Sequence, residues 1–379
     1  MRTARLKAPK CHDTAYYHCV SRIINRDFLL GNEEREHFVS LMRTYETLYG
    51  LRVLTYCVMS NHFHILLEVP RRPDQLPSNE ELVELTRKSL GREEADKLRL
   101  RFQLAEEEGA EALERLRESY FSKMWDLSAY MKMVKQRFTQ WYNKRKGRRG
   151  TLWEERFKSM LVQGKSHALK AMAAYIDLNP VRAKMMEDPK DYRWSGYGEA
   201  VGGRSGNLAQ DAVRYLVEIS HQEYSGGERE ELSNATVLAR WRRFMFGLPE
   251  DETAARRHTA QLRKDQIKAL EKGGKELPMG ELGLQTRVSR EKVLEILENQ
   301  GELSLIQACV CKVRYFIDGA ALGAKSFVEE VFQANRGNFG QTRTEGARTL
   351  KGITQNASNK IYGLRDLRKE VFIVQASPQ

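Results

Sequence analysis

The pattern of apolar and polar positions predicts a strand, a helix and two further strands at the start of the chain. Residues 14–22 and 52–58 are rich in aromatic and β-branched side chains, and residues 62–69 form a third apolar run after a tight turn. Between the first two strands, an apolar stripe at helical spacing predicts a helix with Asn32 as its capping residue and Gly50 at its end. This order matches the first part of a ferredoxin-like unit.

Later segments complete the unit. Residues 127–144 have one apolar and one basic helical face, and residues 156–163 alternate as a fourth strand. The charged, leucine-rich insertion at 72–122 predicts a pair of solvated helices. Residues 166–178 predict an alanine-rich helix that ends before Pro180. We therefore predict an α+β fold with a ferredoxin-like antiparallel sheet and packed helices.

The second half of the chain is predicted to be a mainly helical accessory region. Glycines concentrated at 196–206 favour a domain boundary, which gives a first domain over residues 1–200 and a second over residues 201–379. Residues 289–299 predict one of its helices. The segment that starts at Arg287 is compatible with a DNA-binding helix-turn-helix, and ordinary helical packing explains the same pattern.

The charge of the chain indicates a polyanionic partner. The 379 residues include 63 Lys or Arg and 51 Asp or Glu, a net charge of +12. Residues 132–170 contain 12 basic residues and only two acids, Glu154 and Glu155. Positive charge concentrated in this way suits phosphate contacts, and nucleic acid is the commonest polyanion. A generally basic protein without such a partner is the alternative.

Other function classes find little support. The five cysteines lack the spacing of a disulfide framework or a zinc knuckle, which favours reduced thiols. No apolar run approaches the length of a membrane span or the core of a signal sequence, so we expect a cytoplasmic, nucleoid-associated protein without a membrane partner. No phosphate-loop motif occurs, so we expect no nucleotide cofactor.

His62 and His64 are candidates for metal ligands. They are two residues apart in a predicted strand, so their imidazoles share one face. Neutral imidazole binds Zn, Mn, Ni or Co, and also Mg when oxygen ligands complete the shell. The alternative is a pair of half-buried strand histidines with satisfied ring nitrogens. A third ligand has to come from elsewhere in the chain.

Tyr175 and Asn179 form a second pair of candidate functional residues. They are four residues apart, which places them on one face of the predicted helix if its last turn stays helical. A tyrosine in an apolar helix is usually a core residue, and an asparagine before proline is usually a cap. From the residues alone, a functional role and a purely structural role both remain open for this pair.

Four motifs together resemble the REP-associated tyrosine transposases, a group of the HUH single-strand transposases. They are His62-Phe63-His64, the GTLWEERFKS segment at 150–159, YIDLNPVRA at 175–183 and YRWS at 192–195. The resemblance covers residues 8–200 apart from the insertion. It implies single-strand DNA cleavage and rejoining through a 5′-phosphotyrosine, with a divalent metal, Mg or Mn, and single-stranded or hairpin DNA as partner.

The resemblance also implies roles for particular residues. Tyr175 would be the nucleophile, and His62, His64 and Asn179 would hold the metal, although other members have Gln at the last position. The protein would act as a monomer or homodimer. No general base is identifiable.

The basic helix and the loop after it are the candidate DNA surface, because aromatic residues flank a dense run of positive charge. A solvated loop is the alternative. The candidate DNA-binding residues are Lys132, Lys135, Arg137, Lys144, Arg145, Lys146, Arg148, Arg149, Trp153, Arg156 and Lys158.

Two other functions are compatible with the same residues. One is a non-catalytic DNA-binding regulator on the same fold. The other is a metal-dependent phosphodiesterase that uses activated water and would not need Tyr175.

Overall fold

The computed structural model describes most of the chain. The described residues are 6–203, 207–224, 232–248, 302–311, 314–355 and 360–365, together with a few positions between 253 and 264. The helix predicted at 289–299 and the possible helix-turn-helix that starts at Arg287 lie outside these residues.

The first four strands form the ferredoxin-like core that the sequence predicted. In chain order its elements are β1 (Thr14–Arg22), α1 (Asn32–Leu48), β2 (Arg52–Val58), β3 (His62–Pro70), α5 (Leu127–Lys146) and β4 (Lys158–Val162). The spatial order is β2-β3-β1-β4, and each neighbouring pair is antiparallel. The predicted α+β class and ferredoxin-like sheet are confirmed.

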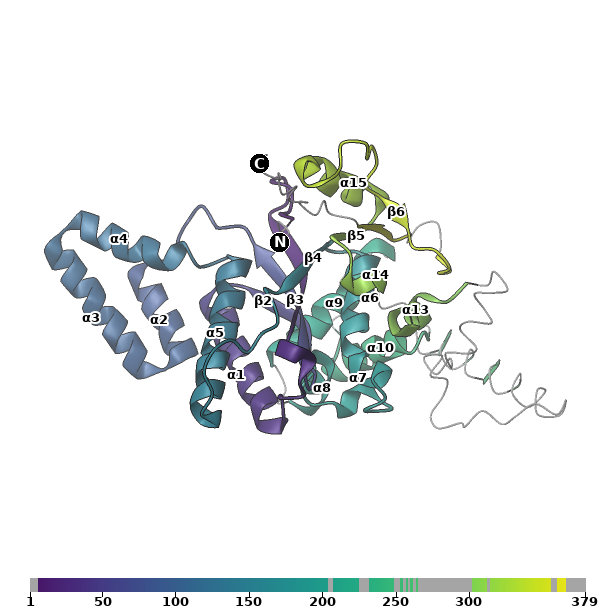
Figure 1. Ribbon diagram of the computed structural model, residues 1–379, viewed down its shortest axis with the longest axis horizontal. Helices are drawn as coiled ribbons and strands as arrows, with labels where there is room; N and C mark the ends of the chain where they lie inside the picture. Colours follow the sequence, from purple (N-terminus) through teal and green to yellow (C-terminus); the bar gives the residue numbers. More distant parts are fainter. Residues whose placement is uncertain are drawn as a thin grey trace, which may run out of the picture.

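Different helices cover the two faces of this sheet (Figure 1). Successive residues of β3 point to opposite faces. Ile65 lies in the apolar cluster formed with α1 and α5, whereas its neighbour Leu66 lies in the cluster formed with α6 (His167–Asp177). His62 and His64 therefore lie on the α6 face, and α5 lies on the other.

The start of α1 differs from the prediction. Asn32 is the first residue of the helix, and Gly31 occupies the capping position without a side-chain hydrogen bond. Glu33 and Glu34 lie in the first turn, where their negative charges favour the positive end of the helix dipole. Acidic residues therefore stabilise this end of α1, and the predicted Asn32 cap is wrong.

The insertion contains three helices, not the predicted pair. They are α2 (Asn79–Leu90), α3 (Arg92–Glu108) and α4 (Ala110–Phe121), which project from one side of the molecule in Figure 1. Gly91 and Gly109 separate them, each with a positive φ that favours glycine. Leu82, Leu98 and Phe121 belong to an apolar cluster of their own, so the insertion has a small hydrophobic core separate from those of the sheet.

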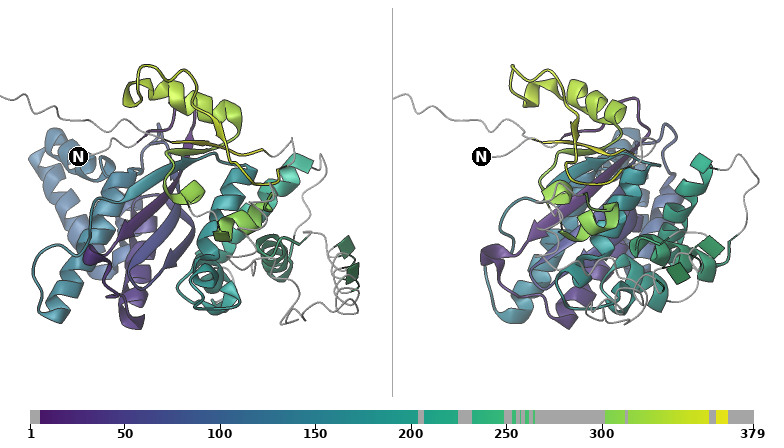
Figure 2. Two further views of the ribbon diagram at one scale, coloured as in Figure 1. Left: turned by 45° about the vertical axis from the view of Figure 1, so that its right-hand side comes forward. Right: turned by 90° about the vertical axis from the view of Figure 1, so that its right-hand side faces the viewer.

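The C-terminal region adds helices and extends the sheet (Figure 2). Its described elements are α9 (Leu208–Tyr224), α10 (Asn234–Met245), α13 (Leu305–Cys311), α14 (Arg314–Ile317), β5 (Ala321–Gly323), α15 (Lys325–Ala334), β6 (Arg348–Thr349) and β7 (Tyr362–Leu364). β5 pairs with β4 in parallel, and β7 and β6 follow. The described part of this region is mainly helical, as predicted, but its strands are too short to show a periodic pattern.

The glycines near residue 200 serve close packing. Gly196 and Gly198 belong to α8 (Gly196–Gly202). A Cβ added to Gly196 would lie 2.3 Å from Oγ1 of Thr55, and one added to Gly198 would lie 2.0 Å from the carbonyl oxygen of Tyr192. One apolar cluster also contains residues from both sides of the predicted boundary. The division into two domains stays a prediction.

A buried carboxyl group joins four elements on the α6 face. Asp177, at the end of α6, is fully buried. It accepts hydrogen bonds from Oγ1 of Thr55 on β2 (2.5 Å), Nε1 of Trp241 on α10 (3.0 Å) and the backbone N–H of Tyr197 on α8 (3.3 Å). Burial raises the pKa of Asp177 to about 7, although the three donors oppose this shift.

This pKa predicts a pH-dependent stability. The folded protein binds the Asp177 proton more tightly than the unfolded chain, so stability falls as pH rises from about 4 to about 7. Asp177→Asn should be less stable than wild type at pH 5, because one amide cannot accept all three bonds, by about 1–3 kcal/mol. It should also lose most of this pH dependence.

Urea unfolding between pH 5 and pH 8 measures both effects. Asp191→Asn, at an exposed position, is the matched control and should keep the wild-type profile. An Asp177→Asn profile as steep as that of wild type would show that another group causes the dependence.

Candidate active site

His62 and His64 lie together at one end of the central strands. Their ring centroids are 5.1 Å apart, and the rings are nearly perpendicular, at 80°. In the register of β1 and β3, Arg22 lies opposite His62, and Val20 lies opposite His64. The shared face predicted from the spacing of the two histidines is confirmed.

Asn61 fixes the tautomer of His62. Nδ2 of Asn61 donates to the carbonyl oxygen of Arg26 (3.0 Å), which directs Oδ1 of Asn61 toward the imidazole. Nδ1 of His62 lies 2.7 Å from that oxygen. Because an amide oxygen only accepts, Nδ1 carries the hydrogen and Nε2 keeps its lone pair.

A buried chain of hydrogen bonds fixes the tautomer of His64. Nδ1 of His18 donates to the carbonyl oxygen of Phe316 (3.0 Å), so Nε2 of the neutral His18 ring is an acceptor. That atom lies 2.9 Å from Nδ1 of His64, which must therefore donate. Nε2 of His64 keeps its lone pair, and it is buried with no hydrogen-bond partner among the described residues.

Burial keeps all three imidazoles neutral. Loss of solvation lowers the pKa of His18 to about 3 and that of His62 to about 4, and it also lowers the pKa of His64. The positive charges of Arg22 and Arg182 lower the pKa of His62 and His64 further. A neutral ring that donates through Nδ1 and keeps a free Nε2 is the form in which histidine binds a metal. His62 and His64 thus fit two ligand positions of a divalent ion.

Tyr175 lies beside the same rings. Its centroid is 5.8 Å from that of His64 and 5.9 Å from that of His18, with the rings in edge-to-face orientation. The ring of Phe316 stacks on it at 4.8 Å, and the Arg182 guanidinium lies 4.5 Å from its centroid. The hydroxyl is buried and makes no hydrogen bond within the described part of the chain. Burial raises the pKa of Tyr175 to about 12, and the Arg182 charge opposes this rise.

Asn179 uses its amide within its own helical turn. Nδ2 donates to the carbonyl oxygens of Tyr175 (3.3 Å) and Ile176 (3.1 Å), and Oδ1 accepts from the Arg182 guanidinium. Arg182 thus uses one of the two lone pairs of the oxygen that a metal ion would bind. Asn179 acts as a cap in this structure, and its role as the third ligand stays a prediction.

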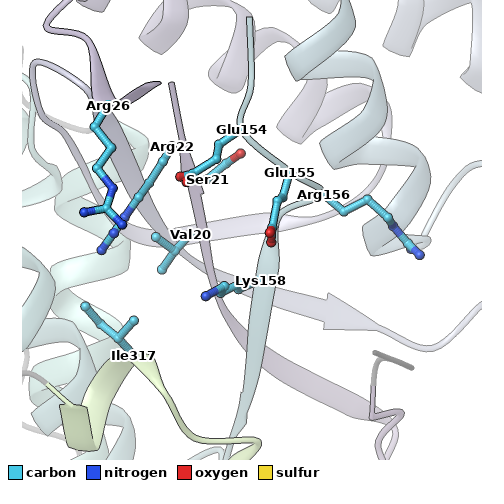
Figure 3. A pocket seen from close by; sticks show the side chains of 9 residues that line it. All are labelled: Val20, Ser21, Arg22, Arg26, Glu154, Glu155, Arg156, Lys158 and Ile317. Atoms are coloured by element: carbon cyan, nitrogen blue, oxygen red, sulfur yellow. The ribbon is translucent and has the colours of Figure 1, made fainter. Parts of the chain in front are cut away.

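A cavity of about 100 Å³ is lined by Val20 and Arg22, the β1 partners of His64 and His62, and Figure 3 shows its side chains. Four basic and two acidic side chains line it together with Val20, Ser21 and Ile317; they are Arg22, Arg26, Arg156, Lys158, Glu154 and Glu155. Figure 3 shows Arg22, Arg26 and Lys158 directed to one side of the cavity, whereas Arg156 points away. The excess positive charge suits a phosphate group.

The basic residues predicted for DNA contact lie in different places. Arg156 and Lys158 line the cavity. Lys132, Lys135 and Arg137 belong to α5, across the sheet from the histidines. Nζ of Lys135 also donates to the carbonyl oxygen of Glu155 (3.0 Å), and burial lowers the pKa of Lys135 to about 8.

The end of α5 and the loop after it carry the remaining basic candidates. Arg145 pairs with Glu33 and Lys146 with Glu34, at 2.6 and 3.0 Å. Lys144 and Arg149 are exposed, and Arg148 is half-buried, 5.9 Å from the centroid of Tyr142. Two of these five cations are thus partly neutralised by α1.

Trp153 does not offer a stacking surface for bases. It is only 7% exposed, and its ring lies 5.4 Å from that of Phe63. Its Nε1 donates to Oγ1 of Thr139 (2.9 Å). Trp153 is therefore a core residue in this structure, and its role as a DNA contact stays a prediction.

Sequence reasoning missed His18, Arg22, Arg26 and Phe316. His18 and Arg22 are four residues apart in the first predicted strand, so strand alternation already placed them on one face. Arg26 follows in a short turn with a positive φ of 62°, for which no sequence signal exists. Phe316 reaches the site from the C-terminal region, beyond any local pattern.

The comparisons with known proteins agree with the resemblance over part of the chain. Residues 11–78 match the family described as "Transposase IS200 like". This segment contains β1 to β3, and therefore the histidine pair, but ends before Tyr175. The resemblance to this class of transposases is confirmed for that segment. No curated protein matches the chain.

One solved structure is similar over a larger part. It is described as "Structure of the REP associates tyrosine transposase bound to a REP hairpin". The identity is 14% and the TM-score is 0.33, with 62% of this chain and 100% of that chain covered. Similarity at this level does not transfer a ligand or an activity.

Within the described residues, no helix is long and apolar enough to cross a membrane.

The hydrogen bond between His18 and His64 predicts an effect on metal affinity. His18→Leu should weaken Mn²⁺ binding about 10–100-fold, because Nδ1 of His64 loses the acceptor that fixes its tautomer. His18→Gln supplies an amide acceptor and an amide donor, so its affinity should stay within a few-fold of wild type.

Isothermal titration with Mn²⁺ measures this effect, and His64→Ala, which removes the ligand itself, should abolish binding at this site. Wild-type affinity in a folded His18→Leu variant would show that the bond does not support a metal ligand.

Proposed function

We propose that the protein is a metal-dependent tyrosine transposase that cleaves and rejoins single-stranded or hairpin DNA through a 5′-phosphotyrosine. The observation that carries the proposal is the position of Tyr175 beside His64, which like the neighbouring His62 keeps Nε2 free, with Val20 and Arg22, the strand partners of these histidines, lining a basic cavity. The match of residues 11–78 to the IS200-like transposases supports the same conclusion.

The residue types suit this chemistry. Oη of Tyr175 would attack the scissile phosphorus, and the bond from phosphorus to the 3′ oxygen would break. The phenol loses its proton to water, and the released 3′ oxygen takes up a proton to become a hydroxyl. The new phosphotyrosine keeps the energy of the phosphodiester, so the 3′-hydroxyl of another strand can reverse the step without ATP.

His62 and His64 would hold a divalent ion, Mg or Mn, through Nε2. When bound there, such an ion supplies positive charge that stabilises the phosphorane-like transition state. Arg22 and Lys158 would hold the phosphate from the cavity side, and Arg182 would favour the phenolate of Tyr175. Oδ1 of Asn179 accepts one bond from Arg182 and has a second lone pair, so it would be the third ligand, and water or the DNA phosphate would complete the shell.

Tyr175 must become accessible before it can react. It is fully buried, and Phe316 of α14 stacks on its ring. In the proposed reaction the Phe316 side chain moves off the Tyr175 ring when DNA binds, whereas its backbone carbonyl keeps the hydrogen bond with His18. The same burial favours a second function, a DNA-binding regulator that retains the site but cleaves nothing. A phosphodiesterase that uses water would not require Tyr175 at all.

Covalent attachment separates these functions. Wild-type protein incubated with a labelled hairpin oligonucleotide and Mn²⁺ should carry DNA after denaturation, and Tyr175→Phe should carry none while keeping DNA and metal binding. Loss of one hydroxyl that makes no hydrogen bond leaves the fold intact. Tyr197→Phe, also at a buried position on the α6 face, is the matched control and should still form the adduct.

Denaturing electrophoresis and mass spectrometry of the adducted peptide give the result. An adduct in Tyr175→Phe, or on another tyrosine, would refute the assignment of the nucleophile. Cleavage without any adduct would indicate the phosphodiesterase, and binding without cleavage the regulator.

The cavity also predicts which cations contact the DNA. Arg22→Gln and Lys158→Gln should each weaken single-strand binding and reduce the slope of log K against log salt by about 0.7. Lys132→Gln, at an exposed position on α5 across the sheet, is the control and should leave the slope unchanged.

Fluorescence anisotropy over a series of salt concentrations measures these slopes. The reverse outcome, a reduced slope in Lys132→Gln alone, would place the DNA on α5 and not at the cavity.

A further inference from the structure

Three metal-binding side chains converge far from the candidate active site. Sγ of Cys11 lies 2.7 Å from Oε1 of Glu330, and Nε2 of His12 lies 3.1 Å from Oε2 of the same carboxyl group. Their ligand atoms all lie within 4.8 Å of one another. Cys11 is exposed, and the side chains of His12 and Glu330 are 36% and 40% exposed, so an ion can reach them from solvent.

This cluster is distinct from the histidine pair. Cys11 and His12 precede β1, whereas His62 lies opposite Arg22 at the other end of that strand. The nine residues of β1 separate the two places by roughly 25–30 Å at about 3.3 Å per residue. An ion at Cys11 therefore cannot take part in chemistry at Tyr175.

The cluster joins two segments that are distant in sequence. Glu330 lies on α15, which follows β5 in the part of the sheet that the C-terminal region adds. Two further contacts already hold these segments together: Nδ2 of Asn335 donates to the carbonyl oxygen of Lys7 (3.2 Å), and the His12 ring packs edge-on against Phe327 at 5.8 Å. The three ligands are thus presented by a preformed contact.

We infer that Cys11, His12 and Glu330 bind Zn²⁺ and thereby tie the segment before β1 to α15. Sulfur, imidazole nitrogen and carboxylate oxygen are the ligand types that zinc takes, with water in the fourth position. Ligand atoms at 2.0–2.3 Å from a tetrahedral zinc lie about 3.3–3.8 Å apart. The contacts of 2.7 and 3.1 Å would lengthen slightly on binding, and the separation between Cys11 and His12, which lies within 4.8 Å, would adjust by about 1 Å at most. On binding, the Cys11 thiol releases its proton to solvent and coordinates as the thiolate.

The proposed zinc ion would have a structural role, separate from the proposed DNA chemistry. The extended part of the sheet contains only short strands, and the zinc would anchor α15 to the end of the longer central strand β1. Zinc should therefore slow amide hydrogen exchange in α15 and leave the exchange of α5 unchanged.

Cobalt provides the decisive probe, because a thiolate ligand gives Co²⁺ a ligand-to-metal charge-transfer band. Cys57 lies opposite His64 in the register of β2 and β3, so the band has to be assigned to Cys11 by the variants and not by its presence alone. One equivalent of Co²⁺ should produce the band, and Zn²⁺ should displace it. Cys11→Ser should lose the band, and Glu330→Gln should bind Co²⁺ about 10-fold more weakly or worse.

His64→Ala is the control that separates the two metal sites. It should keep the cobalt band even though it loses the ion at the candidate active site. No band with the full-length protein, a band that persists in Cys11→Ser, or a band that disappears in His64→Ala would each overturn the inference.

Discussion

The hydrogen bond between His18 and His64 is the interaction on which the candidate site depends. It lies between β1 and β3, where water cannot replace either partner, so the protons of both rings have only one satisfied arrangement. The backbone carbonyl of Phe316 sets this arrangement from one side, and the amide of Asn61 does the same for His62. The Nε2 atoms that we propose as metal ligands are thus kept free by neighbouring groups that would not themselves touch the metal.

The ferredoxin-like part of the fold was predictable because its signals are local. Strands at 14–22 and 52–58 are rich in aromatic and β-branched side chains, the helix at 127–144 has a continuous apolar face, and the order of these elements restricts the possible topologies. The strands β5, β6 and β7 were not predictable, since two or three residues do not define a period. The glycines at positions 196 and 198 belong to the predicted domain boundary, and in the fold they permit close packing against Thr55 and Tyr192.

The spacing of the candidate site residues was predictable from the sequence, whereas their hydrogen bonds and burial were not. The spacing of His62 and His64 and that of Tyr175 and Asn179 gave the correct neighbours, because strands and helices have fixed repeats. Pairing of Oδ1 of Asn179 with Arg182 and burial of Trp153 depend on tertiary packing. Sequence composition does not distinguish an aromatic residue that faces DNA from one that completes a core.

The stacking of Phe316 on Tyr175 makes the C-terminal region part of the candidate site. Through α14 this region supplies the acceptor for His18, the ring over Tyr175 and the Ile317 wall of the cavity. A chain cut after residue 200 would leave Nδ1 of His18 to water and free both of its tautomers. Removing the C-terminal region at the glycine-rich segment would thus change the tautomers of the histidines. It would also remove any binding surface that this region provides, so an activity assay of the shortened chain would not separate the two effects.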